Sequence, residues 1–154
     1  MVYLVLKTLH VIGATVLLGT GAGIAFFMVM AHRTGDARFI AQTARVVVIA
    51  DYVFTASAVI VQPVTGLALA SMAGYPILRG WIGLSLALYV LTGAFWLPVV
   101  WMQSRMRDLA LAAADHGEAP PAEYHRLYRL WFAFGWPAFA AVLGIVWLMV
   151  AKPQ

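Results

Sequence analysis

The chain has 154 residues, of which 64% are hydrophobic and only 10% are charged, and its mean hydropathy is +0.89. Soluble domains carry about 25% charged residues, so this composition excludes a soluble monomer and predicts a membrane protein. The net charge of +4 does not indicate a nucleic-acid partner, because the basic residues lie near the predicted helix ends, and the lack of cysteine excludes disulfides and thiolate ligands.

Four long stretches without a charged residue follow one another along the chain. They contain 21, 27, 25 and 22 residues and are bounded by His10 and His32, Asp51 and Arg79, Arg79 and Arg105, and Arg129 and Lys152. A membrane-spanning helix needs about 20 apolar residues. We therefore predict an all-α fold with four transmembrane helices at about residues 3–31, 46–72, 80–104 and 127–150. These helices form an antiparallel up-and-down bundle and one membrane domain over residues 1–154.

The distribution of basic residues favours one orientation. The first and third connections between the helices, with their flanks, hold seven arginines: Arg33, Arg38, Arg45, Arg105, Arg107, Arg126 and Arg129. The opposite end of the bundle, with the second connection and the two termini, holds only Lys7, Arg79 and Lys152. Positively charged residues are enriched in cytoplasmic loops. We expect a bacterial inner-membrane protein with both termini on the outer, periplasmic side.

The first predicted helix carries a histidine in an otherwise apolar run. His10 shares a helical face with four residues, most of them small: Gly13, Ala14, Leu17 and Gly21. Small residues on such a face either allow close helix packing or leave room for a flat ligand beside the imidazole. A second pair, Gly19 and Gly23, permits a homodimer without requiring one.

The second predicted helix carries a polar stripe with spacing of four and three residues: Asp51, Thr55, Ala58, Gln62 and Thr65. Unpaired polar groups are costly in lipid, so the stripe is expected to face inward. For Asp51 two interpretations remain open. One is a buried ion pair with a cation near the ends of the third and fourth helices: Arg105, His125, Arg126 or Arg129. The other is a proton relay or an anion site.

The third predicted helix repeats this pattern with Ser85, Tyr89, Thr92 and Trp96. In an antiparallel bundle Ser85 and Tyr89 come to the depth of His10 and Gln62. We therefore predict a site in the outer half of the membrane, with walls formed by these four residues.

The fourth predicted helix is rich in aromatic residues, and prolines interrupt three of the helices: Pro63, Pro98 and Pro137. Packing and an interfacial belt account for Trp131 and Trp147. A metal pair of His32 and His125 lacks a third ligand at metal spacing. No phosphate loop, GxGxxG, HExxH or GxSxG motif is present.

Four segments carry a resemblance to known proteins: LKTLHVIGATVLLGTGAGIAFF, DYVFTASAVIVQPVTGLALA, RGWIGLSLALYV and WLMVAKPQ. They resemble an uncharacterised bacterial family of integral membrane proteins, a domain of unknown function, and their layout is similar to the HemJ-type protoporphyrinogen IX oxidases. Those are small four-helix membrane proteins that bind haem b. The resemblance places the proposed haem-ligating histidine of that family on His10. Its helix-3 lysine falls on Ser85 and an arginine of its first helix falls near Phe26, so the basic groups are not retained.

From this resemblance we expect haem b on His10, with the second imidazole nitrogen held by Gln62 or Thr65. Gly13, Ala14 and Gly21 would leave room for the porphyrin. The expected function is electron transfer or tetrapyrrole-related redox chemistry. One alternative is a HemJ-like oxidase. Another is a cofactor-free membrane subunit or small proton-coupled transporter, in which Asp51, Thr55 and Arg129 form the buried polar or relay group. The expected partners are the lipid bilayer and either a second copy of the chain or a redox protein.

Overall fold

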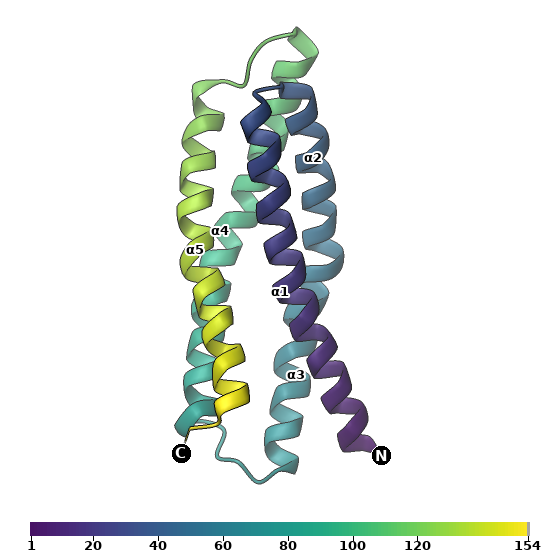
Figure 1. The fold of residues 1–154 in the computed structure, drawn as a ribbon, viewed down its shortest axis with the longest axis vertical. Coiled ribbons are helices and arrows are strands. Elements are labelled where there is room, and N and C mark those ends of the chain that lie inside the picture. The colour runs from purple at the N-terminus through teal and green to yellow at the C-terminus, as the bar shows by residue number, and fades with distance from the viewer. Residues whose placement is uncertain (154) are drawn as a thin grey trace.

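The structure is a computed structural model and describes residues 1–153, in which every regular element is helical. In chain order the elements are α1 (Val2–Thr34), α2 (Ala37–Ala50), η1 (Asp51–Thr55), α3 (Ala56–Met72), α4 (Gly80–His116) and α5 (Ala122–Ala151). The segments α2, η1 and α3 follow one another without a break. Four helical segments are therefore long and apolar enough to cross a membrane, which confirms the predicted all-α four-helix architecture (Figure 1).

The helices extend beyond the predicted spans at the end of the bundle away from the termini. The second begins at Ala37 instead of near residue 46, and the third runs to His116 instead of ending near residue 104. The added turns carry arginines and other polar residues, so a hydropathy criterion detects only the apolar part of each helix. Between α1 and α2 the chain turns at Gly35, which has a φ of 68°, and Asp36 caps α2 by accepting from Arg38 N at 2.8 Å.

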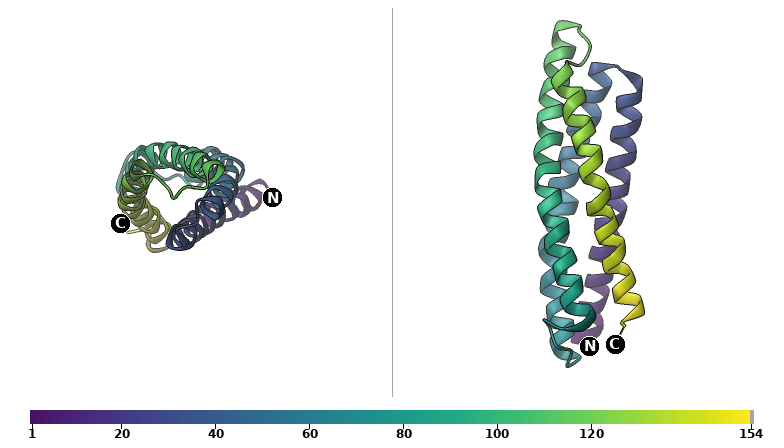
Figure 2. Two further views of the ribbon diagram at one scale, coloured as in Figure 1. Left: turned by 90° about the horizontal axis from the view of Figure 1, so that it is seen from above. Right: turned by 90° about the vertical axis from the view of Figure 1, so that its left-hand side faces the viewer.

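The main apolar core lies at this same end of the bundle. Met28, Ile40, Met106 and Tyr124 are fully buried there, one from each of α1, α2, α4 and α5. Seen along the axis of the bundle, the helices surround a common centre (Figure 2). Toward the termini α1 packs against α3, and α4 packs against α5, while α3 and α4 have little direct contact. The half of the bundle near the termini therefore consists of two helix pairs that are held together less closely.

A five-residue π-helix, η1, lies in the middle of the second spanning segment. Its backbone is widened by one residue, so the Ala56 N–H donates to Asp51 O. Asp51 and Thr55, at its two ends, are 3% and 6% exposed. The predicted stripe of polar residues does face inward, since Gln62 and Thr65 further along α3 are also buried. The π-helix thus brings a carboxylate and a hydroxyl to the centre of the bundle.

Candidate functional site

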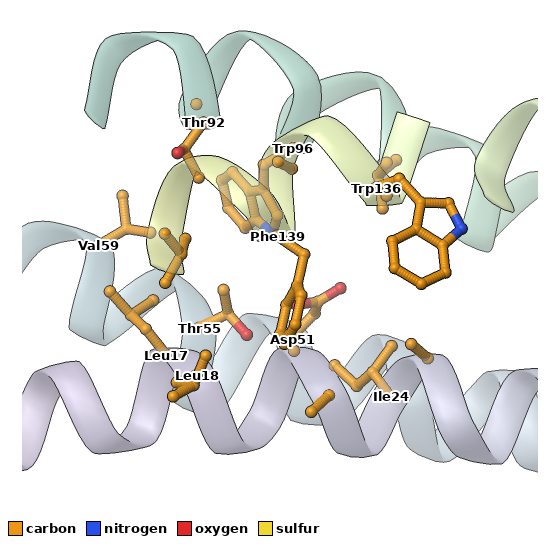
Figure 3. Close-up of a pocket in the computed structure, with 18 of the residues that line it drawn as sticks. Leu17, Leu18, Ile24, Asp51, Thr55, Val59, Thr92, Trp96, Trp136 and Phe139 are labelled. Atoms are coloured by element: carbon orange, nitrogen blue, oxygen red, sulfur yellow. The ribbon is translucent and has the colours of Figure 1, made fainter. Parts of the chain in front are cut away.

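A cavity of about 430 Å³ lies at the centre of the bundle, between α1, the η1–α3 segment, α4 and α5 (Figure 3). Its walls are mainly aliphatic and aromatic, and its size falls in the range of small-molecule sites in proteins. The aromatic part of the wall comes from α4 and α5: Tyr89, Trp96, Trp131, Phe132, Trp136 and Phe139. Polar side chains line one region of it, near η1.

The polar region is organised by a directed chain of hydrogen bonds. An indole N–H can only donate, so the amide oxygen of Gln103 faces Trp131, which donates from Nε1 at 3.2 Å. The amide nitrogen of Gln103 then donates to Asp51 Oδ2 at 2.6 Å. Gln103 is 1% exposed and Trp131 is 4% exposed. This chain links α5, α4 and η1, and it fixes Asp51 as a hydrogen-bond acceptor.

Two further donors face the same carboxyl group. The hydroxyl of Thr55 and the indole N–H of Trp96 both point toward Asp51. Neither reaches hydrogen-bonding geometry, so both are buried polar atoms without a partner in residues 1–153. Such atoms are uncommon in folded proteins and usually have a functional or structural reason. Asp51 is thus surrounded by donors alone.

The other polar residues of the cavity wall are occupied by main-chain partners. Gln62 Nε2 donates to His10 O at 2.8 Å, and Thr92 Oγ1 donates to Leu88 O at 2.8 Å. The hydroxyl of Tyr89 donates to the carbonyl of Val59. In a regular helix this carbonyl would accept from residue 63, but Pro63 has no N–H, so the carbonyl is available to Tyr89.

His10 lies outside the residues that line the cavity. Its Nδ1 is 2.9 Å from Thr65 Oγ1, which agrees with one of the two partners predicted for it, and its ring packs on Gly66. A Cβ atom at Gly66 would come to 3.0 Å from His10 Cε1. The imidazole is therefore held between α1 and α3.

The four residues predicted to form one site are separated in the structure. Gln62 and Tyr89 line the cavity, whereas His10 and Ser85 do not. Ser85 is 4% exposed and donates to Trp81 O of its own helix at 2.7 Å. The polar ends of His10 and Ser85 are turned to Thr65 and to Trp81 O, so only two of the four residues line this cavity.

The small residues near His10 have two different roles. Ala14 and Gly21 line the cavity, although His10 does not. Gly13 instead packs directly on the side-chain amide of Gln62, where a Cβ atom would collide with it. Gly13 therefore leaves room for the Gln62 side chain, which donates to His10 O, so its role is in helix packing.

The ion pair that was one of the two interpretations of Asp51 is not formed within residues 1–153. Arg105 instead pairs with Glu123, with Nε and Oε1 3.0 Å apart, and both side chains are about half exposed. Arg129, assigned to the relay group, is exposed and does not line the cavity. No basic residue reaches Asp51 because these residues lie at the end of the bundle away from the termini, whereas η1 holds Asp51 at the level of Gln103.

His32 belongs to an aromatic cluster at the end of the bundle away from the termini. Its ring stacks on Tyr128 with centroids 3.5 Å apart, and its Nδ1 is 3.3 Å from Tyr124 Oη. The ring of His125 lies edge-on to it at 5.6 Å. No group of three metal-ligating side chains occurs in the described part of the chain, so these contacts are packing interactions.

Three residues of the arrangement were missed by the sequence analysis. Gln103 lies seven residues, or two turns, after Trp96 on α4. Extending the predicted polar stripe of Ser85, Tyr89, Thr92 and Trp96 by two turns would have found it. Trp131 was assigned to packing and an interfacial belt, but it is buried and bonded to Gln103. Gly66 packs against the His10 ring, and nothing in the sequence except its small size could have predicted this contact.

Comparison with known proteins gives one match. A family model described as "Predicted integral membrane protein (DUF2269)" matches residues 4–153. No curated protein and no solved structure matches the chain. The match covers nearly the whole chain and supports the uncharacterised membrane family of the sequence analysis, while it gives no similarity to HemJ-type oxidases.

Proposed function

The chain belongs to this family of predicted integral membrane proteins, and from this premise we propose that its central cavity binds a largely apolar, ring-containing small molecule. The chain is a multi-pass membrane protein with four apolar helices in contact with lipid. We place it in a bacterial inner membrane with both termini outside, since the basic residues favour that orientation.

The observation that carries the proposal is the cavity itself. Its volume of about 430 Å³ lies between four helices and is partly open to the outside, and most of its wall is apolar or aromatic. Packed protein interiors contain few voids larger than a water molecule, and an apolar cavity of this size binds apolar molecules readily. Aromatic rings on α4 and α5 favour a ligand that has a ring of its own.

The lipid bilayer is the expected source of the ligand. The cavity is partly open, and four residues of its wall on α1 and α5 are exposed: Ala22, Ala25, Phe132 and Trp136. Trp136 is 62% exposed and Phe132 is 44% exposed. A wall residue that is also exposed marks an opening, and here the opening faces lipid.

Haem b on His10 is the second candidate, because of one observation. Thr65 holds His10 Nδ1, and Nε2 makes no hydrogen bond within residues 1–153, which is how an axial imidazole is usually oriented. The central cavity does not fit this group, however. Its wall contains no histidine or methionine, so a haem on His10 would have to lie outside it.

The two other functions considered from the sequence differ in their support. A HemJ-like oxidase would need the basic group that falls on Ser85, whose hydroxyl is bonded to its own helix. A small proton-coupled transporter would use Asp51, which does line the cavity. Ligand binding in the cavity is compatible with transport, and it is the step that is tested first.

A cavity-filling variant tests the proposal. Pyrene is a flat, apolar probe that accepts excitation energy from tryptophan, and three tryptophans line the cavity. In dodecyl maltoside we expect saturable tryptophan-to-pyrene energy transfer in the wild type and its loss in Gly93→Leu. A Cβ at Gly93 meets nothing within 4 Å, and Gly93 lines the cavity, so a leucine there takes up part of the space that pyrene would occupy.

Gly19→Leu is the matched control. Gly19 also has open space around its Cβ position, but it is exposed and lies outside the cavity wall. It should bind pyrene as the wild type does. Equal, non-saturable signals from all three proteins would reflect pyrene in the micelle alone and would refute the proposal.

A further inference from the structure

Asp51 is the only acidic or basic residue among those that line the cavity. It is 3% exposed, and no lysine, arginine or histidine pairs with it within residues 1–153. A buried carboxylate without a counter-ion is costly, and such residues inside membranes are most often functional. In the view of Figure 3 its carboxyl group lies next to Phe139, on the side of Trp136.

The groups around Asp51 complement a negative charge. Gln103 donates to Oδ2, and the donors of Thr55 and Trp96 face the same carboxyl group. The direction of the Gln103 bond is imposed by Trp131 on the far side, as described above. The carboxyl group of Asp51 therefore accepts one hydrogen bond, from Gln103, and has no positively charged partner within residues 1–153.

The aromatic residues of the wall also complement a positive charge. Tryptophan is the ring that attracts cations most strongly through its π face, and aromatic cages are a common means of binding ammonium groups. Trp96, Trp131 and Trp136 contribute to the same wall as Asp51. A metal ion would need several oxygen, nitrogen or sulfur ligands, whereas Asp51 is the one carboxylate of this wall and Gln103 presents its amide nitrogen to it.

We propose that the cavity selects lipophilic organic cations, a ring-containing body that carries one protonated amine or quaternary ammonium group, with Asp51 as the counter-ion. This inference rests on the proposed function and names its ligand class. The energetic argument is that the carboxylate is already desolvated in the folded protein, so an entering cation has to give up only its own hydration. The cost of losing this hydration is offset by Coulomb attraction to the carboxylate in a medium of low dielectric constant and by cation–π contacts with the tryptophan rings.

A charge series of pyrene probes tests the inference. Pyrenemethylammonium is a cation, pyrenemethanol is neutral and pyreneacetate is an anion at pH 7, while the ring is the same. In dodecyl maltoside, a non-ionic detergent, we expect the wild type to bind the cation about tenfold more tightly than pyrenemethanol, and the anion more weakly than pyrenemethanol. For each protein we take the ratio of its affinities for the cation and for pyrenemethanol. Partitioning of the two probes into micelles is the same for every protein, so it cancels when these ratios are compared between proteins.

Asp51→Asn keeps an acceptor for Gln103 and removes the charge. We expect it to lose the preference for the cation over pyrenemethanol, and Asp51→Glu to retain that preference. The order of the three probes in the wild type remains a test even if Asp51→Asn does not fold.

The outcomes separate this inference from the proposed function. Saturable binding of pyrenemethanol without a cation preference, or a preference that survives in Asp51→Asn, overturns the cation inference and leaves the cavity as an apolar site. Absence of saturable binding for every probe, with no difference between wild type and Gly93→Leu, overturns both.

Discussion

The hydroxyl of Tyr89 on α4 donates to the main-chain carbonyl of Val59 on α3. The carbonyl is available because Pro63, four residues later, has no N–H to donate to it. α3 and α4 have little other direct contact, so this bond joins two helices at the edge of the cavity. A proline in one helix thus creates the acceptor that fixes its neighbour.

This relationship predicts a specific coupling. Tyr89→Phe should lower the free energy of unfolding by about 1 kcal/mol, the usual net value of one hydrogen bond. In a Pro63→Ala background Val59 regains a main-chain donor, so the same change should cost less. Unfolding in mixed micelles with increasing dodecyl sulfate gives the four free energies of the cycle. An equal loss in both backgrounds would contradict the account.

Gln103 is expected to be important for stability, although it carries no charge. Gln103→Leu removes the partner of both Asp51 and Trp131, and each orphaned buried group costs about 1–3 kcal/mol. The exposed Arg105–Glu123 pair is the comparison, since Arg105→Ala should change stability by no more than about 1 kcal/mol. The same denaturation assay ranks the two variants. A larger loss in Arg105→Ala would show that the Asp51 region does not hold the helices together.

The two glycine environments on α1 predict opposite effects of the same substitution. Gly13→Ala places a Cβ against the Gln62 amide nitrogen, so this side chain must shift away from His10 O, its acceptor, and a buried donor left without a partner costs about 1–3 kcal/mol. Gly19→Ala meets open space and should gain up to about 1 kcal/mol from helix propensity. Thermal unfolding in detergent measures both, and stabilisation by both would exclude a close approach at Gly13.

The haem candidate makes a spectroscopic prediction. If haem b binds His10, expression with a haem precursor yields a Soret band that His10→Ala abolishes. Thr65→Val removes the hydrogen-bond partner of Nδ1 and should shift the band or weaken haem retention. A colourless wild-type protein, despite adequate haem supply, would remove this candidate and leave the cavity proposal intact.

The sequence was sufficient for the fold because lipid imposes simple constraints. Four apolar stretches and the absence of charge within them predict four spanning helices, and the cost of unpaired polar groups predicts that Asp51, Thr55 and Gln62 face inward. These three residues do line the cavity. Helix periodicity gives the face of each helix but not its rotation or its vertical register against its neighbours.

Which residues come together in the site depends on the rotation and vertical register of the helices, which the sequence pattern does not give. Gln103 and Asp51 meet only because of the way in which α4 and η1 are aligned, and the π-helix that positions Asp51 has no sequence signature in the pattern we used. His10 was placed at the correct helix pair, and one of its two predicted partners, Thr65, was found. Its distance from the cavity follows from Gly66, which lets the ring pack into α3.

Native mass spectrometry of the protein released from membranes of its expression host is the most direct test of the central claim, that the cavity holds a small molecule. We predict an adduct of defined mass on the wild type and on Gly19→Leu, and its absence from Gly93→Leu. Bare chain mass for all three proteins, or the same adduct on all three, would contradict the account.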